Sequence, residues 1–276
     1  MFVPFSRNFR GWPARWWGAA SMSLENSEDA VETGAWMPVR LAGVALVALC
    51  SSAACTSQVE PIAVADECPA EPLRRPLEFA VGEGETDQLL IDDFERGDNQ
   101  LEHIGDRDGA WVSGSDTTSV VLTAESSSHC SARGREAGHF AGRDFTEWGA
   151  NWTAVLKQFA NGMARPYDAS EYRGISFWAA AGGGWTGPEQ LSTPVGVTTM
   201  DVAYNGGGCR VCMDFYRTTV SLSPRWERFE IRFDELNQLG IGDPLVPLRR
   251  DQLVGLIFWP PKSGFDIWID DVRFER

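Results

Sequence analysis

The sequence predicts an all-β fold, a sandwich of two antiparallel β-sheets. From residue 89 onward, about ten short runs are apolar or alternate between apolar and polar residues. Glycine, proline, asparagine and aspartate separate these runs, and the periodicity of an amphipathic helix is almost absent. Many short strands joined by turn residues are typical of a β-sandwich.

In chain order, the expected strands cover residues 89–94, 118–123, 138–145, 154–159, 174–181, 195–202, 212–222, 226–233, 252–259 and 265–274. Phe229, Ile231 and Phe233 alternate with charged residues, as expected of a strand with one buried face. The run 252–259 is apolar on both faces, which indicates a central strand covered on both sides. Residues 233–240 are expected to form one short helical turn.

The chain is expected to begin with a processing signal that does not belong to the fold. In residues 37–55, a basic residue, an apolar run and small residues follow one another, which is the layout of a secretory signal peptide. Its end resembles a bacterial lipobox with Cys55 as the lipidated residue, although leucine is usual where Ser52 stands. The apolar run is too short for a membrane span, which takes roughly 20 residues. Residues 1–36 are interpreted as a mis-called upstream extension, with Met37 as the true start.

Residues 56–88 are rich in proline and acidic residues and are expected to form a linker, because they bury too little apolar surface to order themselves. Residues 89–276 form the folded domain. The formal net charge of -15 argues against nucleic acid and anionic membrane surfaces as partners, since both need basic patches. We therefore expect no nucleic-acid partner, membrane contact only through the lipid anchor, and a monomer that binds neutral ligands or cations.

Four cysteines follow the signal, and in an oxidising compartment they suggest two disulfides with three possible pairings. The chain spacing favours Cys209 with Cys212, which leaves Cys68 with Cys130. The first of these pairs also has the spacing of a redox or zinc pair, but no second pair of this kind occurs.

Acidic residues stand in the first and the last expected strand of the domain. They are Asp92, Asp93 and Glu95 at the start and Asp270 and Asp271 at the end. The first and last strands of a sandwich often lie side by side, since chain termini tend to be close. Carboxylates gathered in this way repel one another, and a hard divalent cation such as calcium relieves the repulsion. The alternative is two separate solvated turns, in which each acid accepts hydrogen bonds from its own backbone.

Three segments, LLIDDFERG, YDASEYRGISFWA and GFDIWIDDVRF, together resemble a galactose-binding-domain-like β-jelly roll. The similar families are the family 11 carbohydrate-binding modules, related exported lipoproteins of myxobacteria, and a complex I assembly factor family. The resemblance covers residues 89–276. It implies a jelly roll in which a structural calcium ion bridges the first and last strands, with Asp93, Glu95 and Asp271 as ligands.

Family members that bind glucans use a concave sheet face, on which Asp, Arg and His support aromatic rings. The residues expected to form such a face here are Trp178, Tyr216, Trp259 and Trp268, with Arg217 and Asp266 as hydrogen-bond partners. Trp185, on a glycine-rich turn, is expected at the edge of the site. The alternative is that most of these aromatic side chains fill the core between the sheets. The chain has only four tyrosines, so the resemblance implies no particular glucan.

No catalytic constellation stands out in the sequence. GGGWTG matches G-x-G-x-x-G but lacks the following helix, and the motifs G-x-S-x-G and H-E-x-x-H are absent. Asp234 and Glu235 follow a strand, where carboxylates usually cap a turn rather than face each other across a cleft. We therefore expect non-catalytic binding of a neutral polysaccharide or glycan.

The expected signal peptide and lipobox predict the location of the protein. We expect an exported lipoprotein of the outer membrane or cell surface, or otherwise a secreted or periplasmic protein. Two alternatives to carbohydrate binding remain open. One is an envelope lipoprotein with a protein-interaction or structural role, and the other is a polysaccharide-active enzyme on the same scaffold.

Overall fold

The computed structural model describes residues 68–70, 88–119, 121–127, 130–182 and 190–276. Its strands are β1 (Leu90–Asp92), β2 (Ala110–Ser115), β3 (Val121–Ser127), β4 (Ala137–Arg143), β5 (Ala150–Val155), β6 (Gly174–Ala181), β7 (Leu191–Thr199), β8 (Tyr216–Leu222), β9 (Glu227–Arg232), β10 (Leu253–Phe258) and β11 (Gly264–Glu275). Two short 3-10 helices are η1 (Phe233–Glu235) and η2 (Arg250–Gln252). No helix among the described residues has the length and apolar character needed to span a membrane.

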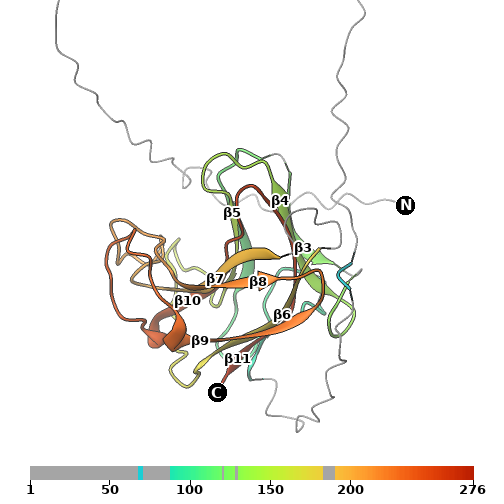
Figure 1. Ribbon diagram of the computed structural model, residues 1–276. Helices are drawn as coiled ribbons and strands as arrows, with labels where there is room; N and C mark the ends of the chain where they lie inside the picture. The colour runs from blue at the N-terminus through green and yellow to red at the C-terminus, as the bar shows by residue number, and fades with distance from the viewer. Residues whose placement is uncertain (1–67, 71–87, 120, 128–129, 183–189) are drawn as a thin grey trace, which may run out of the picture. The chain divides into compact units, whose positions relative to one another are not determined.

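The strands form two antiparallel sheets that pack against each other (Figure 1). The first, which we call the β11 sheet, has the order β3-β4-β11-β6-β9, with β1 also paired to β11. The second, the β10 sheet, has the order β2-β5-β10-β7-β8. The predicted two-sheet antiparallel sandwich is confirmed. The predicted central strand is confirmed as well, because β10 lies in the middle of its sheet and is buried along its whole length.

Aromatic side chains fill much of the core between the sheets. Trp111 and Trp152 come from neighbouring strands of the β10 sheet, and their ring centroids lie 4.6 Å apart. Phe140 of the β11 sheet packs on Trp152 at 5.6 Å. Large apolar side chains that meet in this way supply most of the hydrophobic stabilisation of a sandwich.

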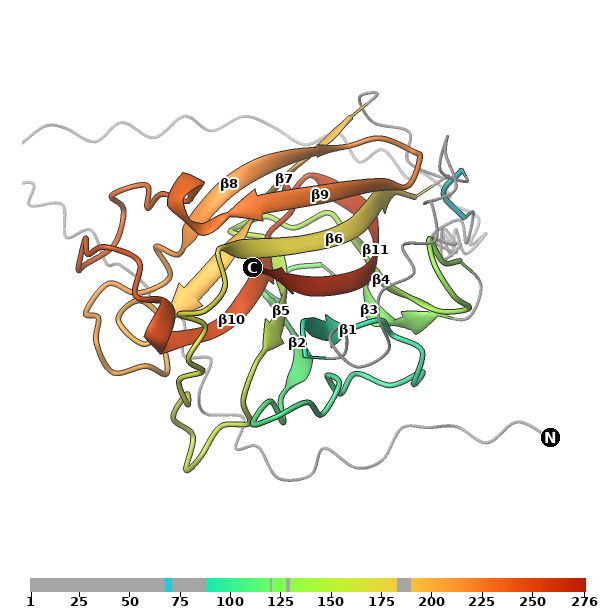
Figure 2. The same ribbon diagram turned by 90° about the horizontal axis from the view of Figure 1, so that it is seen from below.

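Strand β11 lies at the centre of its sheet and changes partner halfway along its length. On one side it pairs with β6 (Figure 2). On the other side residues 264–269 pair with β4, and Val272 and Arg273 pair with β1. Between these partners the chain bulges after Asp270 and before Arg273, and Asp271 there has a φ of 49°. The prediction that the first and last strands lie side by side is confirmed.

The middle segment of the family resemblance packs on the end of β11. The rings of Tyr167 and Tyr172 stack on Phe274 at 5.6 and 4.3 Å. Arg107 is fully buried beside them, and its guanidinium carbon lies 5.6 Å from the centre of the Phe274 ring. The same guanidinium donates a 2.6 Å hydrogen bond to the carbonyl of Leu90, which fixes the start of β1 against the last strand.

Several strands differ from the sequence prediction. β3 and β7 are displaced from the predicted 118–123 and 195–202, and β8 begins at Tyr216 rather than at residue 212. β2 has no counterpart among the predicted strands, because its serine and glycine residues read as a turn. The predicted strand 154–159 is displaced, since β5 already ends at Val155. The chain turns away there because Lys157 forms an ion pair with Asp106, and the backbone N–H of Gln158 donates to Asp108.

Both predicted disulfides are confirmed, as Cys68 is bonded to Cys130 and Cys209 to Cys212. The predicted extension and signal peptide lie outside the described residues, and so does Cys55, whose lipidation stays a prediction. Of the predicted linker, residues 68–70 and 88 are described. Disulfides form in oxidising compartments, so the two bonds agree with export.

Removal of the two disulfides should destabilise the domain unequally. A disulfide restricts the unfolded chain more when it closes a longer loop, which gives about 4 kcal/mol for the sequence separation of 62 and about 2 kcal/mol for the separation of 3. Urea unfolding of Cys68→Ser/Cys130→Ser and of Cys209→Ser/Cys212→Ser measures both losses. Equal losses would contradict the prediction.

Candidate functional site

An aromatic cluster lies on the outer face of the β10 sheet, away from the core. Tyr216 of β8 points into the core, so its neighbours Phe215 and Arg217 point outward. Trp259 follows β10, and Trp148 comes from the loop before β5. We call Trp148, Trp259, Phe215 and Arg217 the aromatic platform.

The rings of the platform are held by contacts with one another. Phe215 and Trp259 are parallel with centroids 5.7 Å apart, and Trp148 meets Trp259 edge-on at 5.5 Å. The indole N–H of Trp259 donates to the carbonyl of Trp148 at 3.1 Å. The Arg217 guanidinium lies 4.3 Å from the centre of the Phe215 ring. Phe215 is fully buried, whereas Trp148 is 37% exposed and Trp259 is partly exposed, so the two tryptophans form the open surface of the cluster.

Polar groups stand beside the platform on neighbouring strands. The carbonyl of Pro194 accepts the backbone N–H of Trp259, and Pro194 pairs in turn with Thr219, whose side chain is exposed. On β5, Asn151 points outward because its neighbours face the core, and its Oδ1 accepts a hydrogen bond from Thr153. A flat apolar surface flanked by hydroxyl and amide groups suits a ligand with apolar ring faces and hydroxyl edges.

Asp214 fixes the loop beside the platform. Its buried carboxylate accepts the four backbone N–H groups of residues 239–242 at 2.9 to 3.2 Å, and it also accepts Arg217 at 3.3 Å. Burial alone would raise the pKa of Asp214, but these backbone donors and Arg217 hold the pKa below its ordinary value. The carboxylate therefore stays charged and orients Arg217 over Phe215.

The structure places only part of the predicted ligand set on the platform. Trp259 and Arg217 belong to it. Tyr216 does not, because its ring lies in the core and its hydroxyl donates to the carbonyl of Val246 at 2.8 Å. Tyr216 is thus corrected to a core residue that fastens the chain before β10. Trp185 lies outside the described residues.

The other predicted ligand residues, Trp178, Asp266 and Trp268, lie on the outer face of the β11 sheet. The Trp268 ring stacks on His139 with centroids 4.0 Å apart, and Asp266 lies 3.0 Å from Nε2 of the same histidine. Trp178 is 9% exposed and Trp268 is 1% exposed. The structure therefore brings these residues together but does not open them to solvent.

A disulfide-bonded segment accounts for this burial. Trp178, Trp226 and Trp268 form a separate apolar cluster with Cys130. Cys130 is bonded to Cys68, and Ala70 exchanges two backbone hydrogen bonds with the turn between β8 and β9, including one from the N–H of Trp226. Residues 68–70 therefore pack beside the cluster, and the prediction of an open binding surface at Trp178, Asp266 and Trp268 is corrected to a covered face.

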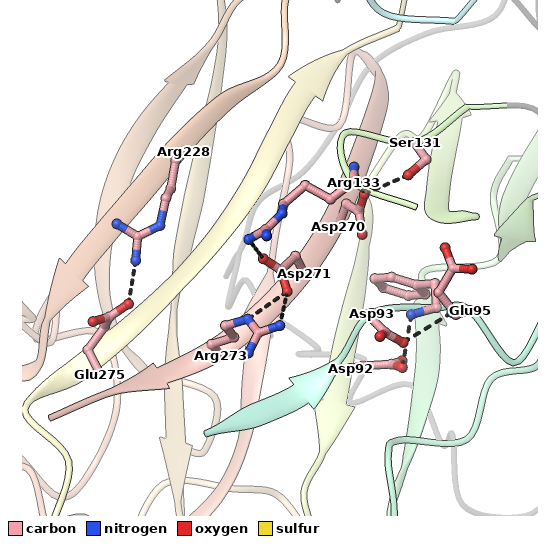
Figure 3. Close-up of polar contacts among 11 residues, drawn as sticks. Asp92, Asp93, Glu95, Ser131, Arg133, Arg228, Asp270, Asp271, Arg273 and Glu275 are labelled. Atoms are coloured by element: carbon pink, nitrogen blue, oxygen red, sulfur yellow. Dashed lines mark hydrogen bonds and ion pairs between the residues drawn. The ribbon is translucent and has the colours of Figure 1, made fainter. Parts of the chain in front are cut away.

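The two adjacent acids of β11 hold the loop that carries this disulfide (Figure 3). Oδ2 of Asp270 accepts the hydroxyl of Ser131 and the next two backbone N–H groups at 2.8 to 3.0 Å. Asp271 forms ion pairs with Arg133 at 2.9 Å and with Arg273 at 2.6 Å. Burial raises the pKa of Asp270 to about 7, because its charged form is poorly solvated.

The structure does not gather the predicted calcium ligands Asp93, Glu95 and Asp271 into one group. Asp271 is occupied by its arginines, and Glu95 accepts the backbone N–H groups of Arg135 and Glu136. Burial alone would raise the pKa of Glu95, but these donors lower it, so its charge is already compensated by the protein.

A different set of carboxylates does come together. Among the described residues, the one group of candidate metal ligands is Asp92, Asp93 and Glu102, whose oxygens lie within 4.8 Å of one another. Asp92 is 1% exposed and accepts the N–H of Phe94 and the indole N–H of Trp111. Burial raises the pKa of Asp92 to about 7, and burial together with Asp93 raises the pKa of Glu102. Three carboxylates in this state fit a hard cation, which would stabilise their charged forms.

Five residues of these sites were missed by the sequence analysis. Phe215 and Thr219 could have been found, because the alternation of DFYRTT places them on the face of Arg217. Asn151, Trp148 and Glu102 gave no comparable signal, since two of them lie in loops and the strand that carries Asn151 was predicted in a shifted position.

The chain is similar to carbohydrate-binding modules among solved structures. The family 11 module of the cellulosomal cellulase Lic26A-Cel5E of Clostridium thermocellum is 15% identical, with 67% of this chain and 92% of that chain covered and a TM-score of 0.43. A family 11 module from the same organism, in complex with a β-1,3-1,4-mixed-linked tetrasaccharide, is 16% identical, with 68% and 94% covered and a TM-score of 0.44. The family 30 module of the cellulosomal cellulase Cel9D-Cel44B of Clostridium thermocellum is 16% identical, with 64% and 96% covered and a TM-score of 0.41.

No family model matches the chain, and neither does any curated protein. The similarity to the modules concerns the arrangement of strands, at low identity and with TM-scores below 0.5. The function therefore rests on the residues of the site.

The carboxyl of Asp270 should make the domain less stable as the pH rises. Its pKa is about 7 in the folded protein and 3.8 ordinarily, so its contribution is fully present below about pH 4 and is lost as the pH rises through 7. Asp270→Asn keeps an oxygen acceptor for the loop but cannot ionise. Urea unfolding with chelator present should show that the urea midpoint decreases between about pH 5 and about pH 8 in the wild type, and decreases less in the variant.

The matched control is Asp144→Asn, whose side chain is 80% exposed. Parallel curves for wild type and Asp270→Asn would refute this reasoning.

Proposed function

We propose that the chain is a non-catalytic polysaccharide-binding protein whose binding surface is the outer face of the β10 sheet. The observation that carries this proposal is the exposed pair of indole rings, Trp148 and Trp259, beside hydroxyl and amide groups. Pyranose rings stack their apolar faces on such rings, and their hydroxyl groups need donors and acceptors nearby. Thr219, which is exposed, supplies such a group, whereas the amide of Asn151 on the same face is only 8% exposed.

The charges around the platform favour a neutral ligand. Arg217 is paired with Asp214, and the nearby cation Lys262 donates to the carbonyl of Thr146, so no guanidinium of the platform is left for an acidic sugar. The formal net charge of the chain is -15, which disfavours long anionic polymers at this face. A neutral polysaccharide fits best.

Support for a binding role over a catalytic one comes from the buried carboxylates. A glycosidase needs two carboxyl groups that face each other across a substrate cleft. The buried acids Asp92, Asp214, Asp266 and Asp270 are each engaged by donors of the protein itself, and none of them lines the platform.

Affinity electrophoresis against soluble neutral polysaccharides tests the platform. Trp259→Ala and Trp148→Ala should each weaken binding by about 2 kcal/mol, or roughly thirtyfold in Kd, because the stacking surface is lost. Tyr204→Ala is the matched control, since Tyr204 is 61% exposed but lies on another loop. If the folded wild type is retarded by no glycan, the proposal fails.

A second candidate function is favoured by one specific observation. Apolar side chains with exposed fractions of 56 to 66% gather on the segments 200–213 and 239–245, namely Tyr204, Val211, Leu239, Ile241 and Leu245. The Cys209–Cys212 disulfide and the carboxylate of Asp214 hold these segments. Rigid apolar loops suit a protein partner, and this envelope interaction role becomes the favoured one if glycan binding is absent.

We further propose that calcium binds Asp92, Asp93 and Glu102 as a structural ion. All three offer carboxylate oxygens, which hard cations prefer. None of them forms an ion pair with an arginine or lysine within the part of the chain that the structure describes. A bound ion would tie β1 to the segment that follows it and would keep the buried carboxyl of Asp92 charged.

Chelation should lower the melting temperature of the wild type. A ligand that binds only the folded state stabilises it by about 2.7 kcal/mol at a hundredfold excess over Kd. Asp93→Asn should abolish the response to calcium, whereas Glu95→Gln should retain it, which separates the observed group from the ligand set that the family resemblance implies. Asp98→Asn, at an exposed acid nearby, serves as the control. A melting temperature indifferent to calcium would exclude the site.

A further inference from the structure

A basic hollow lies between the end of β9 and the segment before β10, away from the platform. Its volume is about 360 Å³, within the roughly 300–1,000 Å³ of ordinary small-ligand sites. The residues that line it are Arg173, Arg232, Phe233, Asp234, Leu248 and Arg250. No part of the platform contributes to it, since Trp259 and Arg250 lie at opposite ends of β10.

Backbone hydrogen bonds join the walls of the hollow. The N–H of Phe233 donates to the carbonyl of Arg173 at 2.8 Å, which links η1 to the start of β6. Arg250 donates from its guanidinium to the carbonyl of Tyr172 at 2.6 Å. Phe233 is buried in the core, and Leu248 packs against the core, so the apolar part of the lining is fixed as well.

The lining carries an excess of positive charge in an acidic protein. It contains three guanidinium groups and one carboxylate, which leaves a formal charge of +2. Arg232 pairs with Asp234 at 2.7 Å, and Arg173 forms a longer contact of 3.4 Å with Glu230, at side chains that are both about half exposed. Arg250 forms no ion pair with a carboxylate of the described residues, so its charge is the one that a ligand can neutralise.

We propose that this hollow binds the carboxylate of an acidic sugar residue, a uronic acid. Guanidinium groups recognise carboxylates by paired, charge-assisted hydrogen bonds, and Arg250 and Arg173 have N–H groups to donate. Asp234 can accept hydroxyl groups of the same ligand, and Phe233 and Leu248 offer apolar contact. The same carboxylate of Asp234 disfavours a dianion such as a phosphate ester, so a hydroxylated monoanion is the chemistry that matches the lining.

This inference rests on the proposed function only for the class of ligand, a saccharide. It assigns acidic sugars to the hollow and neutral sugars to the platform, so an experiment can contradict one proposal without contradicting the other. The probes are a short oligogalacturonate, its methyl ester, a neutral oligosaccharide and inorganic sulfate. The methyl ester has the same sugar rings without the charge.

The experiment is a titration followed by ¹⁵N–¹H NMR of the backbone and of the arginine Nε–H groups, at low and at high salt. Oligogalacturonate should shift the signals of Arg173, Phe233 and Arg250, and its affinity should fall with salt because the contact is ionic. Arg250→Gln and Arg173→Gln should each weaken binding about tenfold, the loss expected for a charged hydrogen bond. Arg249→Gln should leave binding unchanged, since Arg249 pairs with Asp251 and does not line the hollow.

The Trp259→Ala variant separates the two proposals. If acidic saccharide still binds the hollow in this variant, the inference stands whether or not the platform binds neutral glycans. The inference is overturned if the methyl ester or sulfate binds as tightly as oligogalacturonate. It is also overturned if Arg249→Gln weakens binding as much as Arg250→Gln does, or if oligogalacturonate shifts no signal. Arg173→Gln guards against misfolding in Arg250→Gln, because among the described residues the one side-chain hydrogen bond of Arg173 is its exposed contact with Glu230.

Discussion

The partner change along β11 is the constraint on which the rest of the structure depends. The strand pairs first with β4 and then with β1 on the same side, and its register with β6 shifts between Asp270 and Arg273. The side chains of Asp270 and Asp271 stand at this irregularity. One of them holds the loop behind Cys130 and the other holds Arg133, so the disulfide and residues 68–70 are positioned by the same irregularity. β1 pairs with β11 just beyond this point, with a register shift of its own between Leu90 and Asp92, and Asp92 lies buried beside Trp111.

Aromatic side chains of this chain lie in three different environments. Some fill the core, such as Trp152. Others, such as Trp268, point out of the β11 sheet and are covered by the disulfide-bonded segment. Trp148 is 37% exposed and Trp259 is partly exposed on the other side of the sandwich. The composition of the chain alone does not tell these environments apart.

Much of the fold could be predicted because its signals are local. Alternation predicted most of the strands, the run that forms β10 was recognised as central from its apolar faces, and the usual closeness of chain termini indicated that β1 and β11 lie together. The site could be predicted only in part, since alternation says that Tyr216 and Arg217 face opposite ways but not which side is the core. The burial of Trp178 involves a cluster with the distant residues Cys130 and Trp226, and Glu102 joins Asp92 through the folding of a loop. Neither has a local signal.

The central position of the last strand also bears on the order in which the sandwich can assemble. β4, β6 and β1 all need β11 as a neighbour, so their edges stay unpaired until residues 264–275 have left the ribosome. Pairing of β1 with β11 closes almost the whole length of the domain, and contacts of such long range form slowly. The sandwich should thus be completed only once residues 264–275 have emerged, and a chain stopped before them would lose the middle of its sheet rather than an edge.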